Sequence, residues 1–185
     1  MKKGTLQRRL TMALSQLIVD EWRLLSVTRR ESRFPVSERA VAFQLGWYLR
    51  PLLERKWDID CEYNRSGAGD DVDVKRANSR SCPPDLIVHR RGEKRLEDNL
   101  LVLELKTNNE FQRHEGGSVE SVRDIMIEHH YQYGVFLDLG IFPAGPLTRI
   151  FPQWVWLEAP LQALPNRIEP VYSRSEDLIA LMERG

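Results

Sequence analysis

The chain has 185 residues, of which 42% are hydrophobic and 29% are charged, and its formal net charge at neutral pH is zero. A chain of this length can bury a core large enough to fold without disulfides or structural metals. Residues 1–185 are therefore predicted to form a single domain. The zero net charge argues against a protein that coats nucleic acid by bulk electrostatic attraction, although it does not exclude a local basic groove.

The cysteines and the N-terminal residues bear on the compartment. Cys61 and Cys82 are the two cysteines, and neither belongs to a Cys-x-x-Cys pair, so a disulfide framework is excluded and a zinc site is not expected. Charges are scattered through residues 1–25 without an uninterrupted apolar run, so neither a secretory leader nor a membrane segment is expected. These features favour a cytoplasmic protein without a membrane partner.

Four segments are predicted to be helices. Residues 6–28 have apolar side chains at helical spacing, and a second helix is expected to begin after Ser37, a good N-cap, and to run to about Arg55. Residues 118–131 form the third predicted helix, and residues 175–185 form the last.

Five segments are predicted to be strands: residues 57–65, a run beginning at Asp85, and residues 100–107, 134–140 and 153–159. Residues 66–81 and 108–117 read as loops. Three consecutive strands favour antiparallel pairing, and the helix after residue 107 permits a parallel crossover. The fold class is therefore predicted to be α/β, with a central mixed sheet flanked by helices. The tryptophans Trp47, Trp57, Trp154 and Trp156 are expected in the core or at an interface, and residues 153–159 could be an edge strand that pairs with a second subunit in a homodimer.

Charged residues interrupt two of the apolar strands. Asp85 begins one strand, and Glu104 and Lys106 lie two positions apart within the next, so these two share a face of the sheet. If the strands pair as a hairpin, Asp85 lies beside Glu104 and Lys106. Two adjacent carboxylates repel each other, and a divalent cation removes that conflict. A neighbouring lysine can orient an attacking water or stabilise charge on a phosphate oxygen, so the set fits metal-assisted hydrolysis of a phosphodiester.

The same residues carry a resemblance to a known family. Pro84-Asp85, followed 19 residues later by Glu104-Leu105-Lys106, resembles the core motif of the PD-(D/E)XK nuclease superfamily, which has the restriction-endonuclease-like fold. The segments "SERAVAFQLGWYLRPLLE", "CEYNR", "PPDLIVHRRG", "NLLVLELKT" and "YQYGVFLDL" are similar to small stand-alone bacterial members. The similarity covers roughly residues 35–140, which leaves the N-terminal helix and the C-terminal strand and helix as additions.

The resemblance implies roles for individual residues. Asp85 and Glu104 would bind Mg²⁺ or Mn²⁺, with the backbone carbonyl of Leu105 as a further ligand, and Lys106 would be the catalytic lysine. Glu38 matches the acid that the family often places on the preceding helix, as a catalytic residue and a metal ligand. Independently, Glu38 lies on the apolar stripe of its helix, at the positive end of the helix dipole. Thr107 departs from the lysine that often follows the motif, which puts one phosphate contact in doubt.

Each residue also has a structural interpretation. Glu38 could be an ordinary first-turn acid, Asp85 could stabilise a turn, and Glu104 and Lys106 could form an ion pair on a solvated sheet. Arg90 and Arg91, near a predicted hairpin turn, and Arg65, after the first strand, are candidate nucleic-acid contacts. The loop residues Lys75, Arg76 and Arg80 are further candidates, and a solvated loop surface explains these cations equally well.

Two classes of function follow. The first is a magnesium-dependent nuclease acting on DNA, with RNA or a nucleotide as a weaker alternative substrate. The second is a protein of the same fold that binds nucleic acid or a protein partner with little turnover. The complete set of Asp85, Glu104 and Lys106 favours the enzyme, and the zero net charge keeps the binding module open.

Overall fold

The computed structural model of the protein describes residues 1–26, 36–63, 65–66, 73–74, 83–107, 117–144 and 147–160. The helix predicted for residues 175–185 and the loop cations Lys75, Arg76 and Arg80 lie outside these ranges. Within the described ranges the helices are α1 (Lys3–Asp20), α2 (Trp22–Leu25), α3 (Glu38–Leu49) and α4 (Gly117–His129), with short 3₁₀ helices η2 (Arg50–Leu52) and η4 (Leu96–Asp98).

The two N-terminal helices differ from their predicted bounds. The predicted helix at residues 6–28 begins earlier, at Lys3, and its regular α-helical part ends at Asp20 before the short α2. The second helix ends at Leu49 instead of about Arg55 and passes into η2. Pro51 explains this end, because proline has no backbone N–H and its ring clashes with the preceding helical turn.

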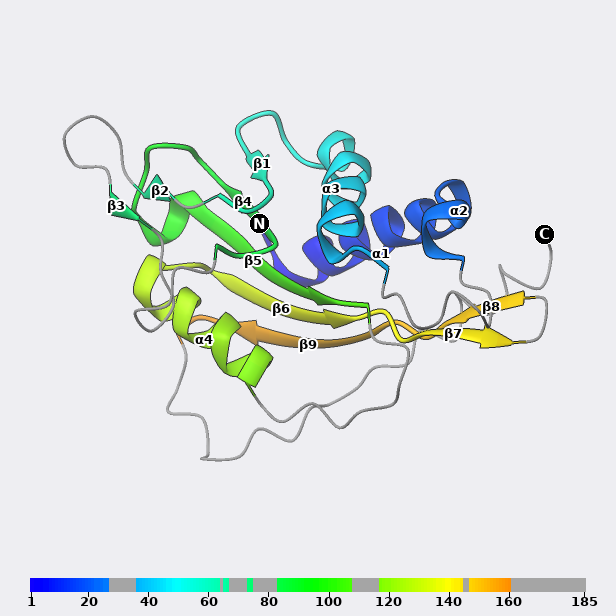
Figure 1. The fold of residues 1–185 in the computed structure, drawn as a ribbon. Helices are drawn as coiled ribbons and strands as arrows, with labels where there is room; N and C mark the ends of the chain where they lie inside the picture. Colours follow the sequence, from blue (N-terminus) through cyan, green and yellow to red (C-terminus); the bar gives the residue numbers. More distant parts are fainter. Residues whose placement is uncertain are drawn as a thin grey trace.

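A mixed sheet of five strands forms the centre of the fold. Its order is β1 (Asp58–Asp60), β4 (Leu86–His89), β5 (Asn99–Lys106), β6 (Tyr133–Asp138) and β9 (Gln153–Glu158). All neighbouring strands are antiparallel except β5 and β6, which are parallel and are connected through α4 (Figure 1). The predicted α/β class and the mixed pairing are confirmed, and β9 lies at an edge of the sheet as expected.

Two small ladders were not predicted. The strand predicted for residues 57–65 is shorter in the structure, where β1 covers Asp58–Asp60. β2 (Arg65–Ser66) begins at the last residue of that predicted strand and pairs with β3 (Asp73–Val74), which lies in the segment expected to be a loop. β7 (Ile141–Ala144) pairs with β8 (Leu147–Ile150) as a hairpin beside the main sheet (Figure 1). Pro143, Gly145 and Pro146 lie in or between these strands, and such residues are typical of turns, which obscures the strand pattern.

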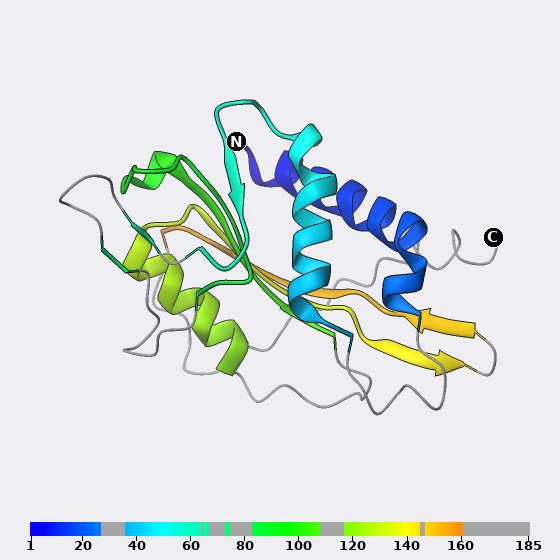
Figure 2. The same cartoon turned by 45° about the horizontal axis from the view of Figure 1, so that its top comes forward.

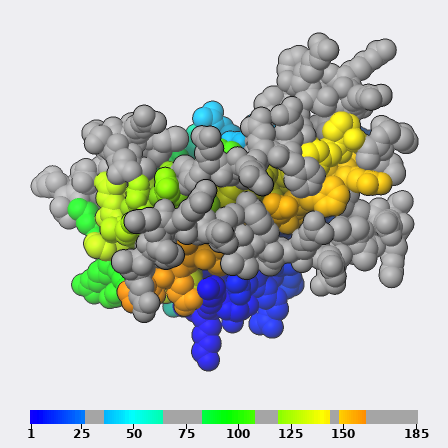
Figure 3. Space-filling model, turned by 90° about the horizontal axis from the view of Figure 1, so that it is seen from below, coloured from blue at the N-terminus to red at the C-terminus, as the bar shows by residue number. Residues whose placement is uncertain are grey.

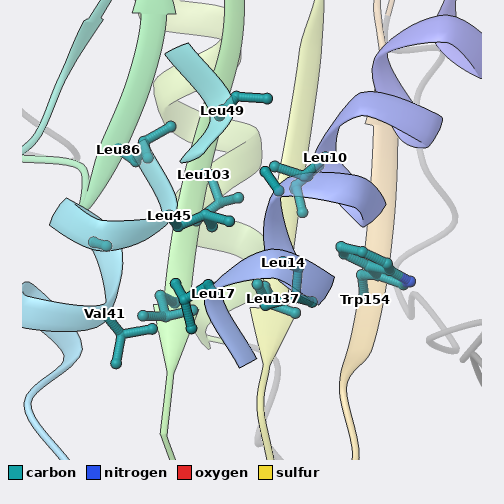
Figure 4. Packing of buried hydrophobic residues seen from close by; sticks show 14 of the residues in the cluster. Leu10, Leu14, Leu17, Val41, Leu45, Leu49, Leu86, Leu103, Leu137 and Trp154 are labelled. Carbon is teal, nitrogen blue, oxygen red and sulfur yellow. The ribbon is translucent and has the colours of Figure 1, made fainter. Parts of the chain in front are cut away.

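Helices cover both faces of the sheet, so the molecule has three layers. α1 and α3 pack on one face and α4 packs on the other (Figure 2). β5 separates the two cores by alternation: Leu101, Leu103 and Leu105 join the cluster under α1 and α3, whereas Val102 joins the cluster under α4. Figure 4 shows side chains of α1 and α3 meeting those of the sheet, among them Leu14, Leu45, Leu103, Leu137 and Trp154.

Figure 3 views the molecule from the α4 side, where α4, β9 and the β7–β8 hairpin are visible and the start of α1 borders β9. Lys3 Nζ lies 3.2 Å from Glu158 Oε2 and joins the two elements. Trp57 and Trp154 are buried as predicted, and Trp156 is half-buried. Trp47 is not a core residue, because 67% of it is exposed on α3.

Gly134 of β6 lies in close contact with α4. A Cβ at this position would lie 2.6 Å from Val122 Cγ1 and 2.3 Å from Met126 Sδ, both on α4. Val122 is β-branched and has one strongly preferred rotamer in a helix, so it cannot move aside readily. Gly134→Ala is expected to destabilise the protein by about 1–3 kcal/mol through overpacking.

Urea denaturation of the parent and the variant measures this loss, and Gly4→Ala is the matched control. A Cβ at Gly4 meets nothing within 4 Å, and alanine in a helix is favoured over glycine by up to about 1 kcal/mol. Equal stability of Gly134→Ala and the parent would show that α4 packs less closely on β6 than described.

Candidate functional site

The two predicted carboxylates meet at one end of the central strands. β4 and β5 pair with Leu86 opposite Leu103, so the antiparallel register continues to place Asp85 opposite Glu104. Asp85 Oδ2 accepts a hydrogen bond of 2.7 Å from the backbone N–H of Leu105, and the side chains of Asp85 and Glu104 are hydrogen-bonded to each other. The structure thus brings Asp85 and Glu104 together as the hairpin interpretation predicted.

Both carboxyl groups of this pair have raised pKa values. Burial raises the pKa of Glu104 to about 8, and the negative charge of Asp85 contributes to the increase. Burial also raises the pKa of Asp85, although the Leu105 N–H and the charge of Lys106 oppose the shift. The hydrogen bond between the carboxyl groups favours the proton on Glu104, and a cation could replace that proton.

Lys106 ends β5 and reaches Glu38 at the beginning of α3. Lys106 Nζ lies 2.8 Å from Glu38 Oε2, and the two side chains are 31% and 35% exposed. Burial alone would lower the pKa of Lys106, but the hydrogen bond and charge of Glu38 outweigh it, and the pKa is raised overall. Lys106 is therefore an ammonium ion at neutral pH, beside the Asp85–Glu104 pair.

The sequence before and within α3 fixes the position of Glu38. Ser37 is the N-cap, and its Oγ accepts a hydrogen bond of 3.3 Å from Ala40 N. Glu38 is then the first helical residue, where the helix dipole favours a carboxylate. Its remaining oxygen, Oε1, accepts a hydrogen bond of 3.3 Å from Thr107 N. The predicted stripe on α3 is confirmed for Ala42, Leu45 and Leu49, which are buried.

Thr107 has a structural role that the sequence analysis missed. Its side chain is buried, and its Oγ1 donates a hydrogen bond of 2.6 Å to the carbonyl of Val36. It thereby ties the end of β5 to the segment that precedes α3. A lysine at this position would lose that bond.

The observed contacts can be compared with two of the purely structural interpretations of these residues. Glu104 and Lys106 do not form the expected same-face ion pair, because Lys106 pairs with Glu38 and Glu104 pairs with Asp85. Glu38 is a first-turn acid, and it also contacts Lys106. Each of its oxygens accepts one hydrogen bond, from Lys106 Nζ and from Thr107 N, and its role as a metal ligand stays a prediction.

Two of the candidate nucleic-acid contacts, Arg90 and Arg91, lie away from this site. Arg90 and Arg91 follow the end of β4 remote from Asp85. Arg90 Nη1 lies 2.9 Å from Asp98 Oδ1. Arg91 pairs with Asp60 through Nε, at 2.8 Å, and through a second contact from Nη2. Arg65 contributes backbone to β2, and its side chain lies outside the described set.

A second polar cluster, centred on Asp60 of β1, was not found from the sequence. The buried His89 places Nε2 2.8 Å from Asp60 Oδ2, and the ring of Tyr63 packs edge-on against His89 with centroids 4.9 Å apart. Burial opposes ionisation of Asp60, but the bonds from His89 and Arg91 outweigh it and hold its pKa well below the usual range. The cluster fastens the short edge strand β1 to β4. The available indication was an alternating pair of acids, Asp58 and Asp60, preceding a strand that ends in basic residues.

Asp60→Asn is expected to lower the free energy of unfolding by about 1–3 kcal/mol at pH 7, because Arg91 loses its ionic partner and His89 loses a charged acceptor. The folded-state pKa of Asp60 is depressed, so its stabilisation is present above the ordinary value of 3.8 and is lost as the pH falls below it.

Denaturant unfolding at several pH values between 3 and 7 measures the difference from the parent. Glu97→Gln, at an exposed 3.8 Å ion pair with Arg95, is the control and should have little effect. A loss that is equally large at pH 3 and pH 7 would contradict an ionic role for Asp60.

The donor set at Asp85 and Glu104 fits a hard divalent cation. Within the described ranges, no group of three or more His, Cys, Asp or Glu side chains is arranged to hold a metal ion. Magnesium, however, often uses one or two carboxylates together with water and substrate phosphate. Asp85 and Glu104 supply two carboxylates in contact with each other. Burial is the main reason that their pKa values are raised, and the charge of Asp85 adds to the increase for Glu104, which a bound cation would offset.

Comparisons with protein-family models, with curated proteins and with solved structures found no match to this chain. Among the residues that the structure describes, no helix combines the length and the apolar character needed to cross a membrane.

Proposed function

We propose that this protein is a metal-dependent nuclease of the PD-(D/E)XK superfamily, with a restriction-endonuclease-like fold, that hydrolyses phosphodiester bonds in DNA. The observation that carries the proposal is the convergence of Asp85, Glu104 and Lys106 at one end of two central strands. The motif spacing that resembles the superfamily and the contact of Lys106 with Glu38 support it further.

The Asp85–Glu104 pair is the proposed binding site for Mg²⁺ or Mn²⁺, with the backbone carbonyl of Leu105 nearby. A bound divalent cation would supply a polarised water and would neutralise charge on the phosphate. The Leu105 N–H fixes one oxygen of Asp85, at 2.7 Å, and so restricts the orientation of that carboxylate. Burial of both carboxyl groups makes the site favour a cation that replaces the proton on Glu104.

Lys106 is the proposed catalytic lysine, and Glu38 is the residue that positions it. An ammonium held at a fixed point can orient a water molecule or stabilise the negative charge that develops on a phosphate oxygen. Glu38 keeps Lys106 charged and limits its rotamers through the 2.8 Å contact. This pairing also balances the charge of the site before substrate binds.

Cleavage assays test the proposed function. Purified protein is incubated with supercoiled plasmid, with circular single-stranded DNA and with RNA, in Mg²⁺ or Mn²⁺ and in EDTA. At least one DNA should be cut in the presence of the metal and remain intact in EDTA, and Asp85→Asn prepared identically should be inactive. If every nucleic acid stays intact at a molar excess of protein, the fold serves binding rather than hydrolysis.

A further inference from the structure

The outward face of α3 carries a stripe of aromatic and basic side chains. Arg39, Phe43, Trp47 and Arg50 are all exposed, and they recur at intervals of four, four and three residues, so they follow one side of the helix and its 3₁₀ extension. Phe43 is 58% exposed and Trp47 is 67% exposed. These four residues are called the α3 stripe. α3 is the outer layer over this face of the sheet (Figure 2), and the stripe points away from the core.

Cations outnumber carboxylates around the stripe. Arg55 and Lys56, just beyond its end, are also exposed. The two neighbouring carboxylates already have cationic partners: Glu54 Oε1 lies 2.8 Å from Arg9 Nη1, and Glu62 pairs with Arg39 of the stripe itself. The excess of positive charge is therefore carried by Arg50, Arg55 and Lys56. The stripe therefore presents two large apolar rings between cations, on a chain whose formal net charge is zero. This local excess of positive charge suits a polyanion.

The stripe is continuous with the candidate active site. Arg39 directly follows Glu38, whose carboxylate contacts Lys106. From Arg39 to Arg50 the axis rises about 17 Å, and Phe43 and Trp47 are about 6 Å apart along it. A chain that leaves the site along α3 would meet a cation, two aromatic rings and a second cation in succession.

We propose that the α3 stripe binds a single-stranded segment of the nucleic-acid substrate. Bases stack on Phe43 and Trp47, and phosphates contact Arg39 and Arg50. Grooves that bind single strands combine cations that follow the backbone with aromatic rings that stack on bases. A duplex keeps its base faces stacked inside the helix, so it offers no partner for two exposed rings. The assignment of this strand as substrate rests on the proposed nuclease function.

Fluorescence anisotropy with labelled oligodeoxythymidine tests the proposal, with a labelled duplex of the same length for comparison. Binding is measured in EDTA so that no cleavage occurs. The parent should bind the single strand more tightly than the duplex. Removing both rings, in Phe43→Ala/Trp47→Ala, should weaken single-strand binding at least about 25-fold, since each stacking contact contributes at least about fivefold. Trp47→Phe should retain most of the affinity.

Two controls make the result specific. Met12→Ala/Val19→Ala removes two apolar side chains of α1 that are 52% and 58% exposed, and it should bind as the parent does. Arg50→Gln should reduce the slope of the logarithm of affinity against the logarithm of salt concentration by about 0.7, the value for one phosphate contact with a single strand. Circular dichroism checks that each variant is folded.

Each outcome decides the proposal. It is overturned if the parent prefers duplex, if the double alanine variant binds as the parent does, or if that variant instead converts a dimeric parent to a monomer, which would make the stripe a self-association surface. If DNA is cleaved but the stripe does not contribute to binding, the nuclease proposal is retained and the single-strand site is rejected. Stripe-dependent binding without cleavage would retain the single-strand site and reject the enzyme.

Discussion

Lys106→Ala is expected to lower phosphodiester hydrolysis by about two to four orders of magnitude while leaving the protein folded and able to bind metal. An ammonium preorganised next to the reacting phosphate stabilises charge that develops only in the transition state, and losing one such group commonly has an effect of this size. The 2.8 Å contact between Lys106 and Glu38 involves side chains that are about one-third exposed. The loss in folding stability should therefore be about 1 kcal/mol or less.

Single-turnover cleavage rates and thermal unfolding, measured on the same preparations, test this expectation. Lys106→Met keeps the aliphatic stem without the charge and should be as inactive as the alanine variant. Lys2→Ala removes an exposed lysine at the start of α1 and should have no effect. Full activity of the folded Lys106→Met variant would remove the ammonium from the mechanism.

Asp85→Asn/Glu104→Gln is expected to abolish specific Mg²⁺ and Mn²⁺ binding and, in EDTA, to stabilise the protein at alkaline pH. The parent holds two half-buried carboxyl groups in contact. Desolvation, with a smaller contribution from the charge of Asp85, raises the pKa of Glu104 from 4.5 to about 8. The double variant has two neutral amides there, so the repulsion between ionised carboxylates is removed.

The direction of the pH dependence follows from linkage. A carboxyl group with a raised folded-state pKa binds more protons in the folded state than in the unfolded state. Its contribution is therefore most favourable below pH 4.5 and is lost as the pH rises toward 8. Lys106 and Glu38, which also lie near the pair, are unchanged in the variant. Screening by solvent limits the difference at pH 8.5 to about 1–2 kcal/mol, or about 2–4 °C in Tm for each kcal/mol.

Thermal unfolding in EDTA and in excess Mg²⁺, from pH 5 to pH 8.5, measures both effects. The variant should gain in Tm over the parent as the pH rises, and Mg²⁺ should raise the Tm of the parent alone. Glu93→Gln, which changes a surface carboxylate in the turn after β4, serves as the control. A double variant that is stabilised by Mg²⁺ as much as the parent would place the metal site elsewhere.

The strands of the central sheet and the contact between Asp85 and Glu104 could be predicted from the sequence. Alternation along β5 predicted that Leu101 and Leu103 pack together on one face, and the hairpin register predicted the contact between Asp85 and Glu104. Both inferences rest on the period of two in a strand, which depends on local geometry alone. The parallel pairing of β5 with β6 followed from the intervening helix.

Contacts that depend on three-dimensional packing could not be predicted in the same way. Nothing in the order of residues specified that Lys106 would choose Glu38 over Glu104, because that choice depends on where α3 begins relative to the end of β5. The pairing of Arg91 with Asp60 depends on the register of β1 against β4. Trp47 was predicted to lie in the core or at an interface because tryptophan side chains are usually found in such places. Its exposure depends on which side of α3 faces the sheet, and the sequence alone does not give that orientation.

Anomalous scattering from Mn²⁺ in crystals of the protein is the most direct test of the central claim that Asp85 and Glu104 hold a catalytic divalent cation. A peak is expected within coordination distance of both carboxylates and of the Leu105 carbonyl, and no such peak is expected in Asp85→Asn. A fully occupied Mn²⁺ at another position, with DNA cleavage that survives in Asp85→Asn, would contradict this claim.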